Sequence, residues 1–180
     1  MLRQIGVRFE VRAVAIDESK FGHESAAEYV CRMARCKAQK ANAQILEGPD
    51  QHPVLAADTI ITLDGGIIGK PADVDQCHRI LQQLSARQHL VLTAVALATA
   101  TDCSLRLSLN RVSFRRISAA QIESYCASAE PVDKAGAYAI QGRAAVFIEH
   151  LEGSYSAVMG LPLFETAELL ESINIVLFES

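Results

Sequence analysis

The chain has 180 residues, of which 50% are hydrophobic and 21% charged, and its formal net charge is −4. This composition is typical of a globular protein with a sizeable core, and we expect one domain over residues 1–180. The acidic balance argues against a binder of nucleic-acid polymers, which needs clustered Lys and Arg side chains. The apolar run 91–100 is too short to span a bilayer, and the first residues lack a signal-peptide core, so we expect no membrane partner.

Cysteine and histidine usage gives no sign of a metal centre. The five cysteines contain no C-x-x-C pair, and the five histidines lack the H-E-x-x-H spacing. We therefore expect reduced thiols in a cytoplasmic protein, without a disulfide framework or a zinc site.

The first predicted element is a half-buried strand, because Val7, Phe9 and Val11 alternate with charged residues. This strand runs out into residues 16–19 and places Glu18 just past its end. Ligand-binding residues often lie at such positions in α/β proteins. A solvated acidic loop is the simpler interpretation of Glu18.

A helix should follow, opened by a capping box between Ser25 and Glu28. Its apolar face carries Tyr29, Val30, Met33 and Ala34. Lys37 falls on the same face, four residues after Met33. Its ammonium either extends to solvent at the helix end or reaches into a site.

The run 54–63 reads as a buried strand that contains Asp58, and a buried carboxylate requires a cation. The Asp-Gly-Gly sequence at 64–66 supplies the turn of a tight hairpin. The chain then returns to Lys70, which the hairpin brings toward the Asp58 end. A carboxylate and an ammonium would face one site, or would form a purely structural Asp58–Lys70 ion pair.

The remaining expected elements are regular. They are a helix over 73–86, adjacent strands over 90–98 and 105–114, a helix from Ser118 through Tyr125, a strand over 145–151 and a helix from Pro162.

The segment 130–142 has neither helical nor strand periodicity, and it mixes charged and small residues with a tyrosine and an amide. Irregular backbone with polar groups beside a rigid sheet commonly forms a binding wall. Gln141 can donate and accept hydrogen bonds at once, which suits reading a base edge. A single glutamine more often stabilises a loop.

Together these stretches resemble the Maf family of nucleoside triphosphate pyrophosphatases, from about Leu2 to the C-terminal helix. The matching motifs are Asp17-Glu18, Glu24-Ser25, Tyr29-Val30, Lys37-Ala38, Ala57-Asp58-Thr59, Gly69-Lys70-Pro71, Asp133-Lys134-Ala135-Gly136-Ala137-Tyr138, Ile140-Gln141-Gly142, Gly153-Ser154-Tyr155 and Gly160-Leu161-Pro162-Leu163. The Ala-Asp-Thr and Ile-Gln-Gly forms are similar to the dTTP/UTP pyrophosphatase branch of that family.

The resemblance implies an α/β fold of the inosine-triphosphatase-like type, with an elongated mixed β-sheet flanked by helices and a cleft between two lobes. It also implies hydrolysis of dTTP, UTP or modified pyrimidine nucleotides to the monophosphate and pyrophosphate with a divalent metal, Mg²⁺ or Mn²⁺. By the same resemblance, Asp58 matches the proton acceptor of the family. Thr59 and Gln141 match its specificity positions, and the matching cleft residues are Glu18, Lys37 and Lys70.

The chemistry of these residues agrees with that reaction. The carboxylates of Glu18 and Asp58 can hold Mg²⁺ while leaving waters on the ion. Asp58 can then orient or deprotonate a water aimed at the α-phosphorus. Charge growing on the pyrophosphate would be neutralised by the metal and three lysines, Lys37, Lys70 and Lys134.

One departure concerns the start of the chain. The family begins with a strand and a Ser-x-Ser-Pro-Arg-Arg loop, whereas residues 2–6 here resemble only the end of the following helix. The arginines of that loop would bind phosphate bidentately. Either the recorded start lies too far downstream, or the chain is truncated. In the second case the alternative function is a catalytically weak nucleotide-binding or cell-division regulatory protein. The oligomeric state, including a homodimer, stays open.

Overall fold

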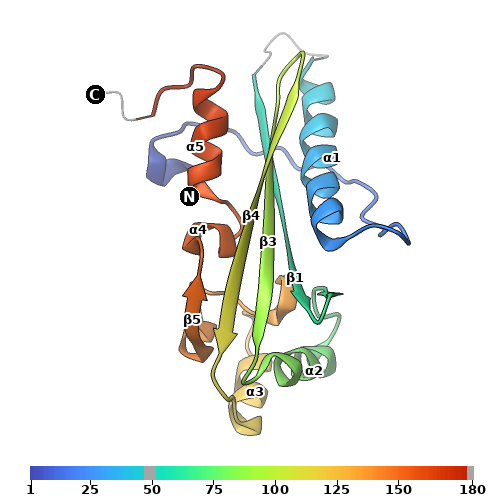
Figure 1. Cartoon of the computed structure of the whole chain (residues 1–180), viewed down its shortest axis with the longest axis vertical. Helices are drawn as coiled ribbons and strands as arrows, with labels where there is room; N and C mark the ends of the chain where they lie inside the picture. Colours follow the sequence, from blue (N-terminus) through green and yellow to red (C-terminus); the bar gives the residue numbers. More distant parts are fainter. Residues whose placement is uncertain (47–51, 178–180) are drawn as a thin grey trace. The chain divides into compact units, whose positions relative to one another are not determined.

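The computed structural model of the chain describes residues 1–46 and 52–177. Within them, a five-stranded sheet runs in the order β2-β1-β3-β4-β5 and is flanked by helices (Figure 1). The strands are β1 (Val54–Leu63), β2 (Gly66–Ile68), β3 (Gln88–Ala98), β4 (Cys103–Phe114) and β5 (Ile148–Glu152). The β1–β2 and β4–β5 pairs are antiparallel. The predicted α/β class, a sheet flanked by helices, is confirmed.

The helices are α1 (Ala26–Leu46), α2 (Val74–Leu84), α3 (Ala119–Cys126), α4 (Tyr155–Val158) and α5 (Leu163–Glu171), with 3₁₀ turns η1 (Leu2–Ile5), η2 (Ala135–Ala137) and η3 (Arg143–Phe147). Four of the helices, α1, α2, α3 and α5, lie close to the places that the sequence predicts, whereas the short helix α4 was not predicted. The strand expected over 145–151 is partly wrong, because its first residues belong to η3 and β5 begins only at Ile148. In the two described ranges, no helix is both long and apolar enough to cross a membrane.

The chain divides into two compact units. Unit 1 comprises Met1–Asp58, Thr93–Ser108 and Gly160–Ser180, and unit 2 comprises Thr59–Leu92 and Leu109–Met159. Strands β1, β3 and β4 contribute residues to both units.

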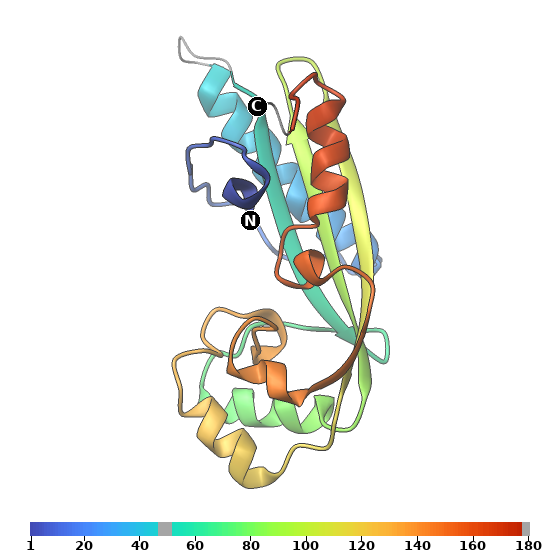
Figure 2. The same ribbon diagram turned by 90° about the vertical axis from the view of Figure 1, so that its left-hand side faces the viewer.

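In unit 1 the predicted capping box opens α1. The Ser25 hydroxyl accepts a 3.2 Å hydrogen bond from the Glu28 N–H, and the Ser25 N–H donates at 2.8 Å to the Glu28 carboxylate. The predicted apolar face of this helix is buried at Val30, Met33 and Ala34. Figures 1 and 2 show α1 and α5 on opposite sides of the strands of this unit. A second apolar cluster joins β3 and α5 through Val95, Leu97, Leu169 and Leu170.

The strand predicted from the alternation of Val7, Phe9 and Val11 is wrong. Residues 7–21 form no strand, Val11 is 86% exposed, and Phe9 is 43% exposed. Alternation reports only side-chain polarity, whereas a strand also needs a neighbouring backbone for its ladder. Side chains of α1 instead bind carbonyl groups of this segment, as Lys40 does at Ala15 with a 2.6 Å hydrogen bond.

In unit 2 the predicted hairpin is confirmed. Asp64 and Gly65 have φ angles of 51° and 79°, the pattern of a tight two-residue turn between β1 and β2. The register pairs Ile61 with Ile68.

An aromatic cluster fills the core of unit 2. The Phe114 ring lies edge-on to the rings of Tyr138 and His89, with centroids 4.9 and 5.0 Å apart. The Nε2 atom of His89 lies 2.8 Å from the Tyr138 hydroxyl. Burial lowers the pKa of His89 to about 4, so this imidazole is neutral at neutral pH.

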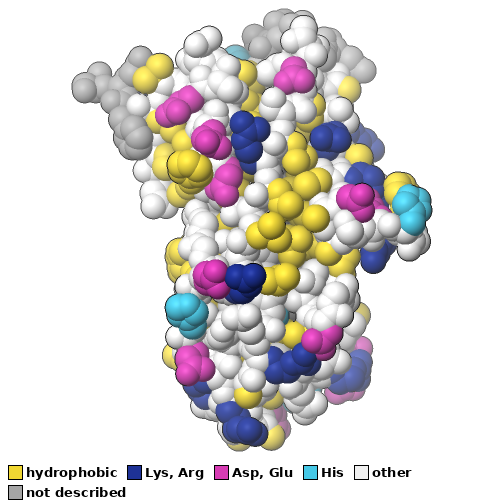
Figure 3. Space-filling view, viewed as in Figure 1, with side chains coloured by type: hydrophobic (Ala, Val, Ile, Leu, Met, Phe, Trp, Pro, Cys, Tyr) yellow, Lys and Arg dark blue, Asp and Glu magenta, His cyan; other side chains and the backbone are white. Residues whose placement is uncertain are grey.

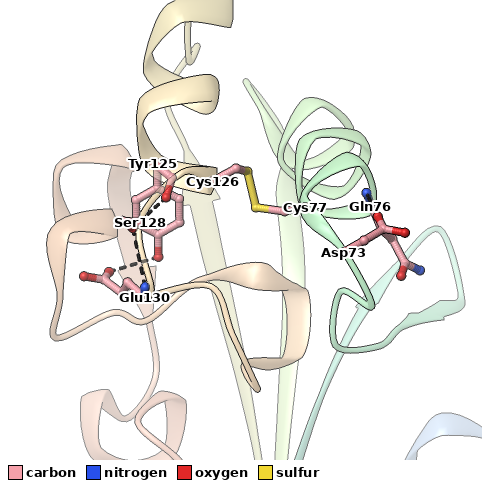
Figure 4. The surroundings of a disulfide bond; sticks show 7 residues. All are labelled: Asp73, Gln76, Cys77, Tyr125, Cys126, Ser128 and Glu130. Atoms are coloured by element: carbon pink, nitrogen blue, oxygen red, sulfur yellow. Dashed lines mark hydrogen bonds between the residues drawn. A yellow bond between two sulfur atoms is a disulfide. The ribbon is translucent and has the colours of Figure 1, made fainter.

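A disulfide joins Cys77 of α2 to Cys126 of α3 within unit 2 (Figure 4). This corrects the expectation of reduced thiols throughout, although Cys31, Cys36 and Cys103 are free. The two half-cystines are 49 residues apart in sequence, and only the packing of α2 on α3 brings their Cα atoms to 5.9 Å. No local spacing pattern indicates such a pair.

Candidate active site

Three predicted site residues meet in unit 1 around the ammonium of Lys37. Its Nζ lies 2.6 Å from Asp58 Oδ1 and 3.0 Å from Glu18 Oε1. The Asp58 side chain is only 16% exposed, and that of Lys37 is 24% exposed. The sequence predicted a cation for Asp58, and Lys37 of α1 supplies one. Lys37 therefore reaches into the site and does not simply extend to solvent.

The charge of this trio is set by its mutual contacts. Burial by itself would lower the pKa of Lys37, but hydrogen bonds to Asp58 and Glu18 raise it overall. The ammonium is therefore retained at neutral pH. Two carboxylate side chains therefore share one ammonium at this point.

Side chains of α1 hold the Glu18 segment in place. The Tyr29 hydroxyl donates a 2.9 Å hydrogen bond to the Glu18 carbonyl, and Arg32 Nη2 donates at 2.8 Å to the Ser19 carbonyl. Arg32 also makes a two-point contact with the Glu24 carboxylate, at 2.7 and 2.8 Å. Bidentate pairs of this kind hold their geometry well. Glu18 is thus oriented by α1 without belonging to a strand end.

Sequence reasoning assigned no positioning role to Tyr29 or Arg32. A signal was present for Tyr29, since Tyr29, Met33 and Lys37 follow one another at four-residue spacing and so share a helix face. Burial, together with the charges of Asp58 and Glu18, raises the pKa of the Tyr29 phenol, which keeps it a hydrogen-bond donor.

Two further predicted residues, Lys70 and Lys134, lie in unit 2 on loops that a hydrogen bond joins. Lys70 and Lys134 are both exposed. The Gly136 N–H donates a 3.1 Å hydrogen bond to the Gly69 carbonyl and so joins the loops that carry them. Gly136 has a φ of 67°, and a Cβ there would lie 2.4 Å from the Ile61 side chain. The left-handed φ and the close approach to Ile61 both favour glycine at this position.

The two predicted specificity residues also belong to unit 2. Thr59 is half-buried in β1. Gln141 is exposed and directly follows the buried Ile140. A hydrogen bond of 3.0 Å from the Gly142 N–H to the Ala139 carbonyl closes the turn that carries Gln141.

The donor set of unit 1 fits a hard divalent cation. Glu18 and Asp58 direct carboxylate oxygens at one point, where the Lys37 ammonium lies. Among the residues that the structure describes, no group of three or more His, Cys, Asp and Glu residues forms a complete cage. Mg²⁺ typically uses one or two carboxylates and takes its other ligands from water and substrate phosphate.

Figure 3 shows Lys and Arg side chains interspersed with Asp and Glu on the face that it views. With a net charge of −4, attraction of a polyphosphate depends on where individual cations are placed.

Comparison with known proteins agrees with these motifs. The family model described as Maf-like protein matches residues 1–173. A dTTP/UTP pyrophosphatase of Nitrosomonas europaea is 46% identical over 99% of this chain and 90% of the relative. Proteins with the same description from Aromatoleum aromaticum and Salmonella typhimurium are each 47% identical over 97% of this chain, and the alignments cover 89% and 87% of those relatives. With so much of the chain matched, the predicted resemblance is confirmed, and the chain belongs to the Maf family.

Proposed function

We propose that this protein is a nucleoside triphosphate pyrophosphatase that hydrolyses dTTP and UTP to the monophosphate and pyrophosphate. The observation that supports this most is the contact of Lys37 with both Glu18 and Asp58. These three residues match the proton-acceptor and cleft positions of the family, and the structure brings them to one point. Relatives that are 46–47% identical to this chain are described as dTTP/UTP pyrophosphatases.

Asp58 is the proposed proton acceptor. Its carboxylate takes a proton from a water that attacks the α-phosphorus. The bond between the α-phosphorus and the oxygen that bridges it to the β-phosphate breaks, and pyrophosphate leaves with that oxygen. The Lys37 ammonium lies 2.6 Å from Asp58 Oδ1 and orients the carboxylate.

Glu18 and Asp58 are the proposed ligands of Mg²⁺ or Mn²⁺. The ion would supply Lewis-acid stabilisation of the phosphate oxygens. The Lys37 ammonium lies where both carboxylates converge. A divalent ion held by both carboxylates would compete with this ammonium for their oxygens.

Lys70 and Lys134 are proposed to bind the leaving pyrophosphate, because their loops are exposed and are joined by the Gly136–Gly69 hydrogen bond. Two ammonium groups on linked loops can neutralise charge that grows on a polyphosphate as it departs. Thr59 and Gln141 are proposed to select the base, since a hydroxyl and an amide can pair with the O4 and N3–H edge that uracil and thymine share.

Product analysis tests the reaction class. Purified protein incubated with dTTP or UTP and Mg²⁺ or Mn²⁺ should release pyrophosphate and the monophosphate, and a chelator should stop the release. In water enriched in ¹⁸O, the label should enter the monophosphate, because the water attacks the α-phosphorus. Orthophosphate and the diphosphate as first products would contradict the proposal. Binding of dTTP without turnover would favour a nucleotide-binding regulator instead.

A further inference from the structure

The carboxylate of Glu130 is committed to three hydrogen bonds within unit 2. Its Oε1 accepts from the Tyr125 hydroxyl at 2.9 Å and from the Ala144 N–H at 3.1 Å. Its Oε2 accepts from the Arg143 N–H at 2.8 Å. These two N–H groups open η3, and they lie two and three positions after Gln141 in the sequence. Glu130 therefore caps the backbone that immediately follows the predicted base-reading residue.

This cap replaces one that the local sequence cannot supply. The residue at the N-cap position of η3 is Gly142, which has no side chain to accept a hydrogen bond. A Cβ at Gly142 would lie 2.4 Å from the Glu130 carboxyl carbon. The carboxylate thus occupies the space that a side chain at Gly142 would need. The turn is shaped around an acid from twelve positions earlier in the sequence.

The Glu130 carboxylate is also held by Tyr125 of α3, a helix that the disulfide joins to α2. Tyr125 is buried, and burial together with Glu130 raises the pKa of its phenol, so it stays a donor. The next residue, Cys126, is linked to α2 by the disulfide. Figure 4 shows Tyr125 beside Cys126 and the Glu130 carboxylate beyond it at the Tyr125 hydroxyl, with the Glu130 N–H directed at Ser128. Glu130 therefore links the Gln141 turn to the α2–α3 pair.

We infer that Glu130 is a positioning residue for base selection, which fixes the turn that carries Gln141 and thereby the direction in which the Gln141 amide meets the base. The inference rests on the proposed function and adds to it the element that holds the specificity group in place. An amide at position 130 turns one acceptor oxygen into an NH₂ group, which would face a donor. The turn then loses its fixed geometry, although the shape of the side chain is kept.

Glu130→Gln is the decisive variant, and Glu123→Gln on the exposed face of α3 is its matched control. For Glu130→Gln, the ratio of kcat/KM for dTTP or UTP to that for dATP should fall about tenfold, as expected when polar groups at a base edge lose their alignment. The ratio for Glu123→Gln should be unchanged. Amide hydrogen exchange at Arg143 and Ala144 should be faster in Glu130→Gln alone.

A double-mutant cycle separates positioning from a general structural effect. In a Gln141→Ala background, Glu130→Gln should cause no further loss of base preference, because its effect passes through the amide. Equal loss for every base, or a full additional loss in the double variant, would overturn the inference. If Glu130→Gln does not fold, Tyr125→Phe removes only one of the three hydrogen bonds and should shift the ratio in the same direction by a smaller factor; an unchanged ratio would count against the inference.

Failure of the proposed function would be visible separately. If the parent protein released no pyrophosphate from any triphosphate, the proposed pyrophosphatase function would be contradicted. Calorimetric binding of dTMP against dAMP would then still test Glu130, because base selection needs no turnover. A parent preference for dTMP that Glu130→Gln leaves intact would overturn the inference by itself.

Discussion

Lys37 on α1 and Asp58 in β1 are 21 positions apart in the chain, and their side chains meet in a 2.6 Å hydrogen bond. Both groups are largely removed from solvent. Burying two charged groups costs desolvation free energy. Removal of one partner leaves the other charge buried without compensation. We therefore make separate predictions for the substitution of Asp58 and for the substitution of Lys37.

Asp58→Asn should lower kcat by a factor of about one hundred or more, the usual cost of losing a general base. The fold should persist, because asparagine has nearly the same shape. Turnover and the circular dichroism spectrum are the measurements. Asp64→Asn is the matched control, since Asp64 lies at the tip of the same hairpin, 73% exposed, and contacts Arg87. A variant at position 58 that kept most of its turnover would remove Asp58 from the mechanism.

Lys37→Met should lower the rate of pyrophosphate release and tighten the binding of Mn²⁺ in the absence of nucleotide. The two carboxylates lose their internal cation in this variant, and a divalent ion relieves their repulsion. Isothermal titration with Mn²⁺ measures this directly, with Lys20→Met as an exposed control in the same segment. Unchanged or weaker Mn²⁺ binding would mean that Glu18 and Asp58 do not share a metal.

His89 makes the folded state sensitive to acid. Burial lowers its folded pKa to about 4 from an ordinary value of 6.5, so the unfolded chain binds the proton more strongly. This contribution is fully present above pH 6.5 and is lost as the pH falls from 6.5 to about 4. Its size is roughly 3 kcal/mol.

Denaturant unfolding between pH 7.5 and 4.5 measures this dependence. His89→Gln should lower stability at neutral pH but flatten the decline toward acid. His150→Gln should keep the slope of the parent, because His150 is exposed. An identical slope in His89→Gln would show that other groups carry the acid sensitivity.

The disulfide should be a major support of unit 2. Closing a loop between residues 49 positions apart is worth about 4 kcal/mol by chain entropy. Dithiothreitol should therefore lower the denaturant midpoint, and Cys126→Ser should match the reduced parent and not respond to the reagent. Cys103→Ser should still respond, because Cys103 is a free thiol. A parent midpoint that reduction does not move would contradict this.

Local chemistry explains which parts of the structure were predictable from the sequence. The capping box at Ser25 and the turn at Asp64 depend on residues within three or four positions of one another, and both were found. The predictions that failed concern features that depend on segments distant in the sequence. The alternation around Phe9 has no ladder partner, and the Cys77–Cys126 bridge exists only because α2 packs on α3.

The same distinction holds within the candidate site. Residue type alone marked Asp58, because a carboxylate in a buried strand is costly without a partner. For Lys37 the helix face left two possibilities open, and only the family resemblance matched it to a cleft residue. The role of Glu130 could not be foreseen, since its partners are backbone N–H groups 13 and 14 positions away. Backbone donors leave no signature in a sequence.

Gln141→Ala should reduce kcat/KM for dTTP and UTP much more than for purine triphosphates. A site built to pair with one base edge penalises an analogue that leaves its groups unpaired, by roughly 1–3 kcal/mol for each buried group. Gln141 is exposed in the free protein, so the penalty arises only when a base covers it. Removing the amide should therefore flatten the preference and leave the stability of the free protein nearly unchanged.

Steady-state kinetics with dTTP, UTP, dATP and GTP measure that flattening. Gln83→Ala, at an exposed position of α2, is the control and should behave like the parent. A selective loss for dTTP and UTP indicates base reading, whereas an equal loss on all four substrates indicates phosphate positioning. The reason is that the triphosphate is common to all four substrates and the base edge is not. An equal loss on all four would assign Gln141 to the phosphates or to the turn at Gly142, and Thr59 would then remain as the base-selecting group to be tested by Thr59→Val.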